Sequence, residues 1–368
     1  MGLELADIFR RYGNAYRQKY SARMPSTHLK VMRAIEQCRT EALGGQVYRC
    51  PDCEQVQYSY HSCRNRHCPK CQNENAQVWL EKQQALLLPM PYFLLTFTIP
   101  AEFNTVARRY QSSFYDLLFK TSAAATQQLA QDPRFIGGMI GMVGVLHTWG
   151  RNLAYHPHIH YLVPGGGLAP DGNTWLATRH PFLLPVKALS LIFRGKLRDT
   201  LRNTPYYRYI PAKVWQQKWV VHCEPVGSGL GALKYLAPYI FRVAISNNRI
   251  LKLENDRVTF QYRDTDSGAE KRCTLAVEDF IHRFLQHVLP KGFVKVRYYG
   301  LFSPGKRHTL ATLRQRLTED VDALPVDSPE ERSKSKTSDA AARSHVCPVC
   351  GHPMQPGPCL YPSGLSPP

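Results

Sequence analysis

The sequence predicts a mixed α/β protein of the α+β kind, and three observations support that class. Apolar residues recur at helical spacing within residues 1–45, and a second helical pattern follows at 102–131. Two β-rich runs, 139–147 and 154–163, are joined by a short polar segment, which is the pattern of an antiparallel hairpin. Residues 46–75 are rich in cysteine and turn residues, which is typical of a small metal-bound module. A chain of 368 residues with 43% hydrophobic content can build one sizeable core beside such modules.

The same periodicities predict the remaining elements in order. Further helices are predicted at residues 76–89, 186–203, 230–241 and 277–287, and further strands at 93–99, 215–223, 250–262, 271–275 and 292–299. These elements divide the chain into four parts. A helical and zinc-binding part spans residues 1–90 and a main domain spans 91–310, followed by a linker at 311–344 and a short cysteine-rich tail at 345–368. The linker is charged, rich in serine and poor in large apolar residues, so we expect it to be disordered.

The charge balance favours a polyanionic partner. Lys and Arg number 47 against 28 Asp and Glu, which gives a formal net charge of +19. Nucleic acid is the common partner of such a chain. An anionic membrane is disfavoured because the longest apolar runs are far too short to span a bilayer. The first residues are acidic rather than signal-like, so we expect a soluble cytoplasmic protein whose 11 cysteines are metal ligands or buried thiols.

Two CxxC pairs in the cysteine-rich stretch predict a structural zinc site. Cys50 and Cys53 form one pair, and Cys68 and Cys71 form the other. Each pair can present two thiolates from a tight turn, so the two turns together can close a tetrahedral Zn²⁺ site. Free thiols or a redox pair are the alternatives, and Cys63, His61 or His67 could replace a ligand. Between the pairs, Arg64, Arg66 and Lys70 are phosphate-binding residue types, which predicts a DNA-reading module; a zinc-stapled scaffold with solvated charges is the alternative.

The tail offers a second set of metal ligands. Cys347, Cys350, His352 and Cys359 could bind another zinc ion. The segment is short and rich in proline, so it could not fold without metal. A disordered or incomplete half-site is the alternative.

The run from His156 to His160 predicts a metal centre on a strand. Residues two apart on a strand face the same side, so His158 and His160 present two imidazoles to one point, with His156 in phase. Such a pair is a bidentate platform for a divalent cation. If the hairpin forms, His147 on the partner strand can supply a third ligand. A set of satisfied core histidines is the alternative.

Two tyrosines four residues apart provide candidate nucleophiles. Tyr235 and Tyr239 share one face of the predicted helix at 230–241. A phenol can attack phosphorus and conserve the energy of the phosphodiester, and two phenols allow two sequential transfers. The chain has 20 tyrosines, and pairs at this spacing also arise from packing alone. Arg242 and Arg249 follow closely and are candidate DNA contacts.

Together these motifs resemble the insertion-sequence 91 family of transposases. His158-Ile159-His160 matches the HUH motif (His, hydrophobic, His) of rolling-circle nucleases, and Tyr235 with Tyr239 resembles the nucleophiles of the tandem-tyrosine subgroup. The cysteine-rich segment is similar to the family's N-terminal zinc-binding domain, and the resemblance covers roughly residues 25–305. The chain departs from the Arg-Tyr-Thr-His-Arg sequence of many members, where it has Pro238-Tyr239-Ile240-Phe241-Arg242.

The resemblance implies an HUH-nuclease core with a central antiparallel sheet flanked by helices in the domain at 91–310. It implies Mg²⁺ or Mn²⁺ at His158 and His160, nucleophilic roles for Tyr235 and Tyr239, and single-stranded DNA at element ends as the substrate. The reaction would be rolling-circle transposition through a 5′-phosphotyrosine, near the nucleoid of a bacterium. Three alternatives use the same features: a zinc-dependent DNA-binding regulator without catalysis, a plasmid replication initiator or relaxase, and a zinc hydrolase. The hydrolase is disfavoured because no Glu base adjoins the histidines.

Overall fold

The computed structural model describes residues 2–71, 79, 81, 83–84, 86–228, 231, 233, 243–264, 267–322 and 345–362. They form two compact units. The smaller unit combines the N-terminal residues Met1–Gln72 with the C-terminal residues Leu324–Pro368, and the larger unit lies within Asn73–Ala323. Among the described residues, no helix is both long enough and apolar enough to cross a membrane.

A five-stranded antiparallel sheet is the centre of the larger unit. Its strands are β3 (Pro91–Thr98), β4 (Gly141–Trp149), β5 (Tyr155–Pro164), β8 (Val221–Ser228) and β12 (Val296–Gly300). Their order is β12-β4-β5-β3-β8, so β5, which carries the histidine run, is the central strand. The predicted hairpin of β4 and β5 is therefore confirmed, as is the α+β class with an antiparallel sheet flanked by helices.

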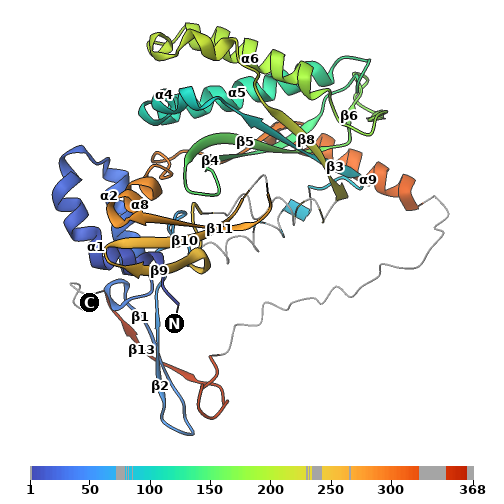
Figure 1. Cartoon of the computed structure of the whole chain (residues 1–368). Coiled ribbons are helices and arrows are strands. Elements are labelled where there is room, and N and C mark those ends of the chain that lie inside the picture. Colours follow the sequence, from blue (N-terminus) through green and yellow to red (C-terminus); the bar gives the residue numbers. More distant parts are fainter. Residues whose placement is uncertain are drawn as a thin grey trace. The chain divides into compact units, whose positions relative to one another are not determined.

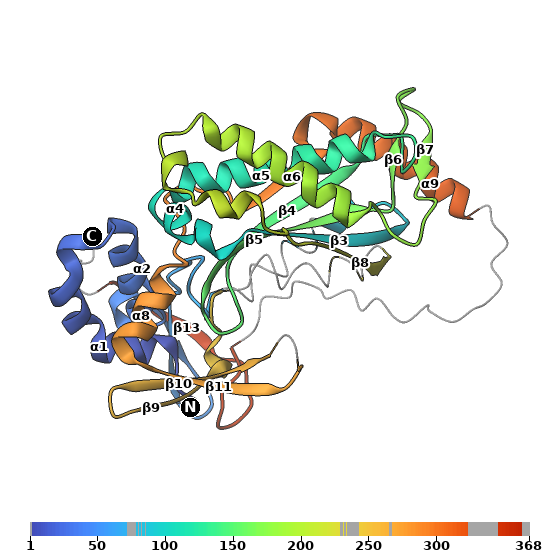
Figure 2. The same ribbon diagram turned by 45° about the horizontal axis from the view of Figure 1, so that its top comes forward.

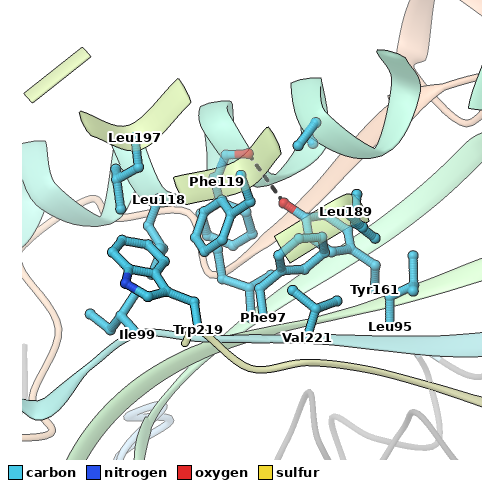
Figure 3. Packing of buried hydrophobic residues seen from close by; sticks show 14 of the residues in the cluster. Leu95, Phe97, Ile99, Leu118, Phe119, Tyr161, Leu189, Leu197, Trp219 and Val221 are labelled. Carbon is cyan, nitrogen blue, oxygen red and sulfur yellow. Dashed lines mark hydrogen bonds between the residues drawn. The ribbon is translucent and has the colours of Figure 1, made fainter. Parts of the chain in front are cut away.

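Helices cover one face of this sheet (Figures 1 and 2). They are α4 (Asn104–Arg109), α5 (Gln111–Ala130) and α6 (Val186–Arg202). Leu118 and Phe119 of α5 and Leu189 of α6 pack against alternate strand residues such as Phe97 and Tyr161, as Figure 3 shows. Strand side chains alternate between faces, so this core fixes which residues of β3, β4 and β5 face the other way.

The opposite face of the sheet carries a second apolar cluster. Leu94, Val145 and Leu162 point to this side and pack with residues of α9 (Arg307–Asp322), including Leu310 and Leu313. The predicted disordered linker at 311–344 is thus wrong for its first part, because leucines at helical spacing fasten α9 to the core. Residues 323–344 lie outside the described residues.

A separate three-stranded sheet, ordered β11-β10-β9, lies in the same unit. Its strands are β9 (Ile250–Glu254), β10 (Arg257–Arg263) and β11 (Glu270–Ala276), followed by α8 (Val277–Leu285). The sequence predicted one strand over 250–262, but Asn255 and Asp256 both have positive φ and make a two-residue turn inside it. Asn and Asp tolerate that conformation best after glycine, which explains why the chain reverses there.

Short elements complete the larger unit. A two-stranded ribbon pairs β6 (Gly166–Leu168) with β7 (Trp175–Ala177). The predicted strand at 215–223 begins only at β8, because a 3₁₀ turn at Ala212–Trp215 and the buried Trp219 precede it. Other 3₁₀ turns are Ala101–Phe103, Tyr207–Tyr209, Asn247–Arg249 and Pro304–Lys306. The helices predicted at 76–89 and 230–241 fall largely outside the described residues.

The smaller unit joins both ends of the chain. It contains α1 (Leu5–Tyr20), α2 (Ser26–Gln37), two 3₁₀ turns at Ser21–Arg23 and Glu41–Leu43, and a three-stranded sheet. That sheet has the order β13-β1-β2, from β1 (Gly45–Arg49), β2 (Val56–Tyr60) and β13 (Gln355–Leu360). The tail predicted as a separate module at 345–368 therefore adds a strand to the N-terminal sheet.

Candidate functional site

Three histidines converge on one face of the central sheet. His158 and His160 lie on β5, and His147 lies on β4 directly opposite His158. His147 and His160 are buried, while His158 is half-buried. One possible ligand atom from each histidine lies within 4.8 Å of the others. Imidazole nitrogens bound to one ion at about 2.1 Å each are at most about 4.2 Å apart, so small side-chain movements would close a coordination shell.

The second nitrogen of two of these rings has a defined partner. His158 Nδ1 lies 2.7 Å from the His156 carbonyl oxygen, and His160 Nδ1 lies 2.9 Å from Thr96 Oγ1. A carbonyl only accepts, so Nδ1 of His158 carries the proton and Nε2 keeps its lone pair. Such outer partners fix ring orientation at metal sites. No sequence pattern marks Thr96 as one of them.

Aromatic groups continue this site toward the β4–β5 turn. The Trp149 ring stacks on His147 at 4.9 Å between centroids, and Lys295 Nζ lies 5.2 Å above that indole. His287 is fully buried behind the turn, where its ring nitrogens lie 3.3 Å from Thr148 Oγ1 and 3.2 Å from the Leu153 carbonyl oxygen. Burial lowers the pKa of His287 to about 4, so the ring is neutral at pH 7 and supports the turn.

His156 stays outside the histidine cluster. Its ring is 5.2 Å from that of His158, but the convergent group contains only the other three histidines. Burial lowers its pKa. We therefore describe His156 as a neighbour whose carbonyl orients His158.

A His–Glu pair that the sequence analysis missed lies on the same face. On β8, His222 is the cross-strand partner of Thr96, which in turn is the partner of His160 on β5. His222 Nε2 lies 3.5 Å from Glu224 Oε2, and both side chains are partly exposed. Strands are about 4.8 Å apart, so this pair lies roughly 10 Å from the backbone of His160. The sequence signal that could have identified this pair is the His-x-Glu spacing, which places both side chains on one face of a strand.

The tyrosines predicted as nucleophiles, Tyr235 and Tyr239, lie outside the described residues, as does Arg242. The described residue nearest to Tyr235 in sequence is Leu233, which is buried with Leu94 and Leu162. Those two residues belong to the sheet face that carries the histidines.

In the smaller unit, the predicted grouping of Cys50, Cys53, Cys68 and Cys71 needs correction. Cys68 and Cys71 lie instead with Cys38 and Cys63, with ligand atoms within 4.8 Å of one another. Sγ of Cys71 is 3.6 Å from Sγ of both Cys38 and Cys63. Cys38 follows α2 at the spacing of an apolar helix position and lies 25 residues before Cys63, so its sequence pattern does not mark it as a ligand.

The other two N-terminal cysteines face the tail. Cys50 and Cys53 lie with Cys347 and Cys350. His352 is 3.0 Å from a carboxylate oxygen of Asp52 at the edge of this group. Cys359 is apart from it on β13, with its Sγ 3.1 Å from Gln46 Oε1. The ligand set predicted for the tail from spacing is therefore divided. Cys347 and Cys350 join the two N-terminal cysteines, whereas Cys359 lies on β13, which pairs with β1.

The basic residues predicted to contact DNA differ in their surroundings. Arg64 and Arg66 are exposed, but Lys70 Nζ forms a 2.6 Å ion pair with Glu4. In the larger unit, Arg249 is half-buried and donates from Nε to the Gln261 carbonyl at 2.8 Å.

Arg249 also lines a cavity of about 320 Å³ in that unit. The cavity is lined by Arg151, Arg249, Gln261, Tyr262, Arg263 and Glu270. Three guanidinium groups beside one carboxylate make it a candidate phosphate-binding surface.

Comparison with known proteins gives consistent matches along the chain. A family model described as "Putative transposase" (Y2_Tnp) matches residues 141–309, and one described as "Transposase zinc-binding domain" (Zn_Tnp_IS91) matches residues 8–99. The chain is 40% identical over 372 residues to "Putative transposase y4qJ" of Sinorhizobium fredii, covering 95% of this chain and 93% of that protein. It is 29% identical over 283 residues to "Transposase for insertion sequence element IS801" of Pseudomonas savastanoi pv. phaseolicola, covering 72% and 68%. No solved structure matches.

Proposed function

We propose a specific chemistry for this chain, which belongs to the insertion-sequence 91 family of transposases and has that family's N-terminal zinc-binding domain. The chain nicks and rejoins single-stranded DNA at element ends through a 5′-phosphotyrosine, during rolling-circle transposition. The observation that supports this most is the convergence of His147, His158 and His160 on one sheet face. That arrangement would give a metal ion three imidazole ligands, with the Thr96 and His156 oxygens behind two of them.

A divalent cation bound by the three histidines would supply Lewis-acid polarisation of a phosphate oxygen. Imidazole ligands suit transition metals better than Mg²⁺, which prefers oxygen ligands. We therefore expect Mn²⁺ to support cleavage at lower concentration than Mg²⁺. Trp149, stacked on His147, would help to hold that ring in place.

Tyr235 and Tyr239 are the proposed nucleophiles. A phenolate oxygen forms the new bond to phosphorus while the bond from phosphorus to the 3′ oxygen breaks, so the protein retains the 5′ phosphate and the DNA leaves with a 3′-OH. Leu233, buried on the histidine face, supports this assignment for Tyr235, because two residues span at most about 7 Å. The reverse attack by a 3′-OH rejoins the strand without ATP.

The phenol proton needs an acceptor, and the pair of His222 and Glu224 is the proposed one. It lies on the same sheet face, two strands from His160, and is partly exposed to solvent. A neutral imidazole of His222 can take the proton while the Glu224 carboxylate stabilises the imidazolium. The same imidazolium can return a proton when the bond to tyrosine is broken.

DNA contacts are proposed at both units. Arg151 and Arg263, around the cavity of the larger unit, would hold backbone phosphates. The exposed Arg64 and Arg66 of the zinc-binding domain would bind the element end.

A covalent-adduct assay tests the proposal. The full-length protein is incubated with an oligonucleotide of an element end and Mn²⁺, and adducts are resolved by denaturing electrophoresis. We expect Tyr235→Phe and Tyr239→Phe together to abolish the adduct, and His158→Ala with His160→Ala to abolish it while DNA binding persists. His180→Ala, an exposed histidine away from the cluster, is the matched control and should leave the adduct unchanged.

The alternatives give different results in the same assay. A DNA-binding regulator would form no adduct at all. A replication initiator or relaxase would form the adduct with an oligonucleotide of a plasmid origin, run in parallel, and not with one of an element end.

A further inference from the structure

The two ends of the chain meet in a second cluster of four cysteines. Cys50 and Cys53 lie in the turn between β1 and β2, and Cys347 and Cys350 lie near the start of the described tail residues 345–362. The family's zinc-binding model ends at residue 99 and so contains only the first pair. The second pair is almost 300 residues away in sequence.

The two cysteine turns have the same backbone conformation. In the first, Glu54 N donates to the Cys50 carbonyl at 3.1 Å, and Cys50 N donates to the Gln55 carbonyl at 2.9 Å. In the second, Gly351 N donates to the Cys347 carbonyl at 3.0 Å, and Cys347 N donates to the His352 carbonyl at 2.8 Å. The residue after the last cysteine has positive φ in both, 57° at Glu54 and 78° at Gly351. A strained φ at a non-glycine residue such as Glu54 persists only where its surroundings hold it, whereas Gly351 adopts the same conformation without strain. Both turns can therefore present their two thiols in the same way.

The sulfur atoms of the two turns are spaced for a metal rather than for a disulfide. Sγ of Cys350 lies 3.4 Å from Sγ of Cys50 and 3.6 Å from that of Cys53, and Cys53 and Cys347 are 3.5 Å apart. A disulfide needs about 2.05 Å. Four thiolates at about 2.3 Å from one Zn²⁺ lie about 3.8 Å apart, close to the observed distances.

Strand pairing brings the two turns together. β13 pairs with β1 from Gly45 opposite Leu360 to Arg49 opposite Gln355. The Tyr48 ring stacks on His345 at 3.7 Å, and Cys50, Cys347 and Met354 form a small buried cluster. Gly44 has φ of 68°, and a Cβ there would collide with the Leu360 carbonyl oxygen, so this position accommodates the returning tail.

We propose that Cys50, Cys53, Cys347 and Cys350 bind one structural Zn²⁺, which makes the C-terminal segment part of the N-terminal zinc-binding domain. The domain then holds two zinc ions, since Cys38, Cys63, Cys68 and Cys71 form the other site. The second ion would cross-link Cys50 and Cys53, which precede the larger unit in sequence, to Cys347 and Cys350, which follow it.

Zinc stoichiometry of the full-length protein tests the proposal. The parent protein carries His158→Ala and His160→Ala, so that the proposed histidine site holds no zinc. Elemental analysis of this parent, purified under reducing conditions, is expected to give two zinc ions per chain. Adding Cys347→Ser with Cys350→Ser should give one, and adding Cys63→Ser with Cys68→Ser should also give one. Cys359→Ser, on β13 but outside both clusters, is the matched control and should keep two. A parent with one zinc, or a Cys347/Cys350 variant of it with two, would overturn the proposal.

A second measurement leaves every ligand in place and so does not depend on the folding of a variant. A specific protease site is inserted between residues 323 and 344, and the chain is cut there. The tail peptide is expected to co-elute with the body in size-exclusion chromatography and to separate after EDTA removes the zinc. Separation before chelation, or retention after verified loss of zinc, would contradict a zinc-held tail.

Discussion

Replacing Thr96 with valine removes one hydroxyl group that orients a proposed metal ligand. Thr96 Oγ1 lies 2.9 Å from His160 Nδ1, and valine keeps the shape and β propensity of the strand position. Loss of such an outer partner typically weakens metal affinity 10- to 100-fold, which is about 1.4 to 2.7 kcal/mol. In a cleavage assay titrated with Mn²⁺, Thr96→Val should raise the half-saturating Mn²⁺ concentration by that factor. The maximal rate should recover at high Mn²⁺, because the three imidazoles remain.

Two variants of the same strand sharpen this test. Thr96→Ser keeps the hydroxyl and should stay within about threefold of wild type. Thr98 is the cross-strand partner of His158, whose Nδ1 bonds to the His156 carbonyl instead. Thr98→Val is therefore the matched control and should leave the Mn²⁺ requirement unchanged. If Thr96→Val behaves like wild type, or if Thr98→Val is equally impaired, Thr96 does not position His160.

Three further predictions follow from named residues. Glu224→Gln should lower the cleavage rate about 10- to 100-fold, whereas DNA binding should not change, because the variant lacks the carboxylate that lies 3.5 Å from His222; an unchanged cleavage rate would remove the pair from the mechanism. Arg64→Ala should reduce the salt dependence of DNA affinity by about one counterion, and an unchanged slope would mean that this exposed residue does not contact phosphate. For His287, the folded pKa of about 4 lies below the unfolded value of 6.5, so stability is fully present above pH 6.5 and is lost as pH falls toward 4. Measured by urea unfolding, the His287→Gln variant should lose about 2 kcal/mol less stability between pH 7 and pH 5 than the wild type loses. An identical pH slope in the two proteins would refute the burial argument.

The strands of the candidate site were predictable because their signals are local. Alternating apolar residues and a short polar turn define β4 and β5, and the period of two along a strand aligns His158 with His160. The cross-strand pairing of His147 with His158 also follows from the predicted hairpin. Thr96 and His222 were missed because β3 and β8 reach β5 only through pairings that no local pattern encodes.

The cysteine clusters show where spacing fails as a guide. CxxC spacing identifies turns that bind metal, but it does not say which turns share an ion. Cys38 has no partner nearby in sequence, and Cys347 meets Cys53 only because β13 returns to β1. The turn at Asn255 and Asp256 is different: its signal was present in the sequence, and a long β-rich run obscured it.

The identity of the residue that carries the DNA tests the central claim most directly. The adduct is formed with an oligonucleotide labelled at its 3′ end, digested with trypsin and analysed by tandem mass spectrometry. Cleavage after Lys234 and Arg242 isolates residues 235–242, which contain both proposed nucleophiles. The account predicts that the 3′-labelled fragment stays on this peptide, joined through a 5′ phosphate to Tyr235 or Tyr239. An adduct on any other residue, or a 3′-phosphate linkage, would contradict it.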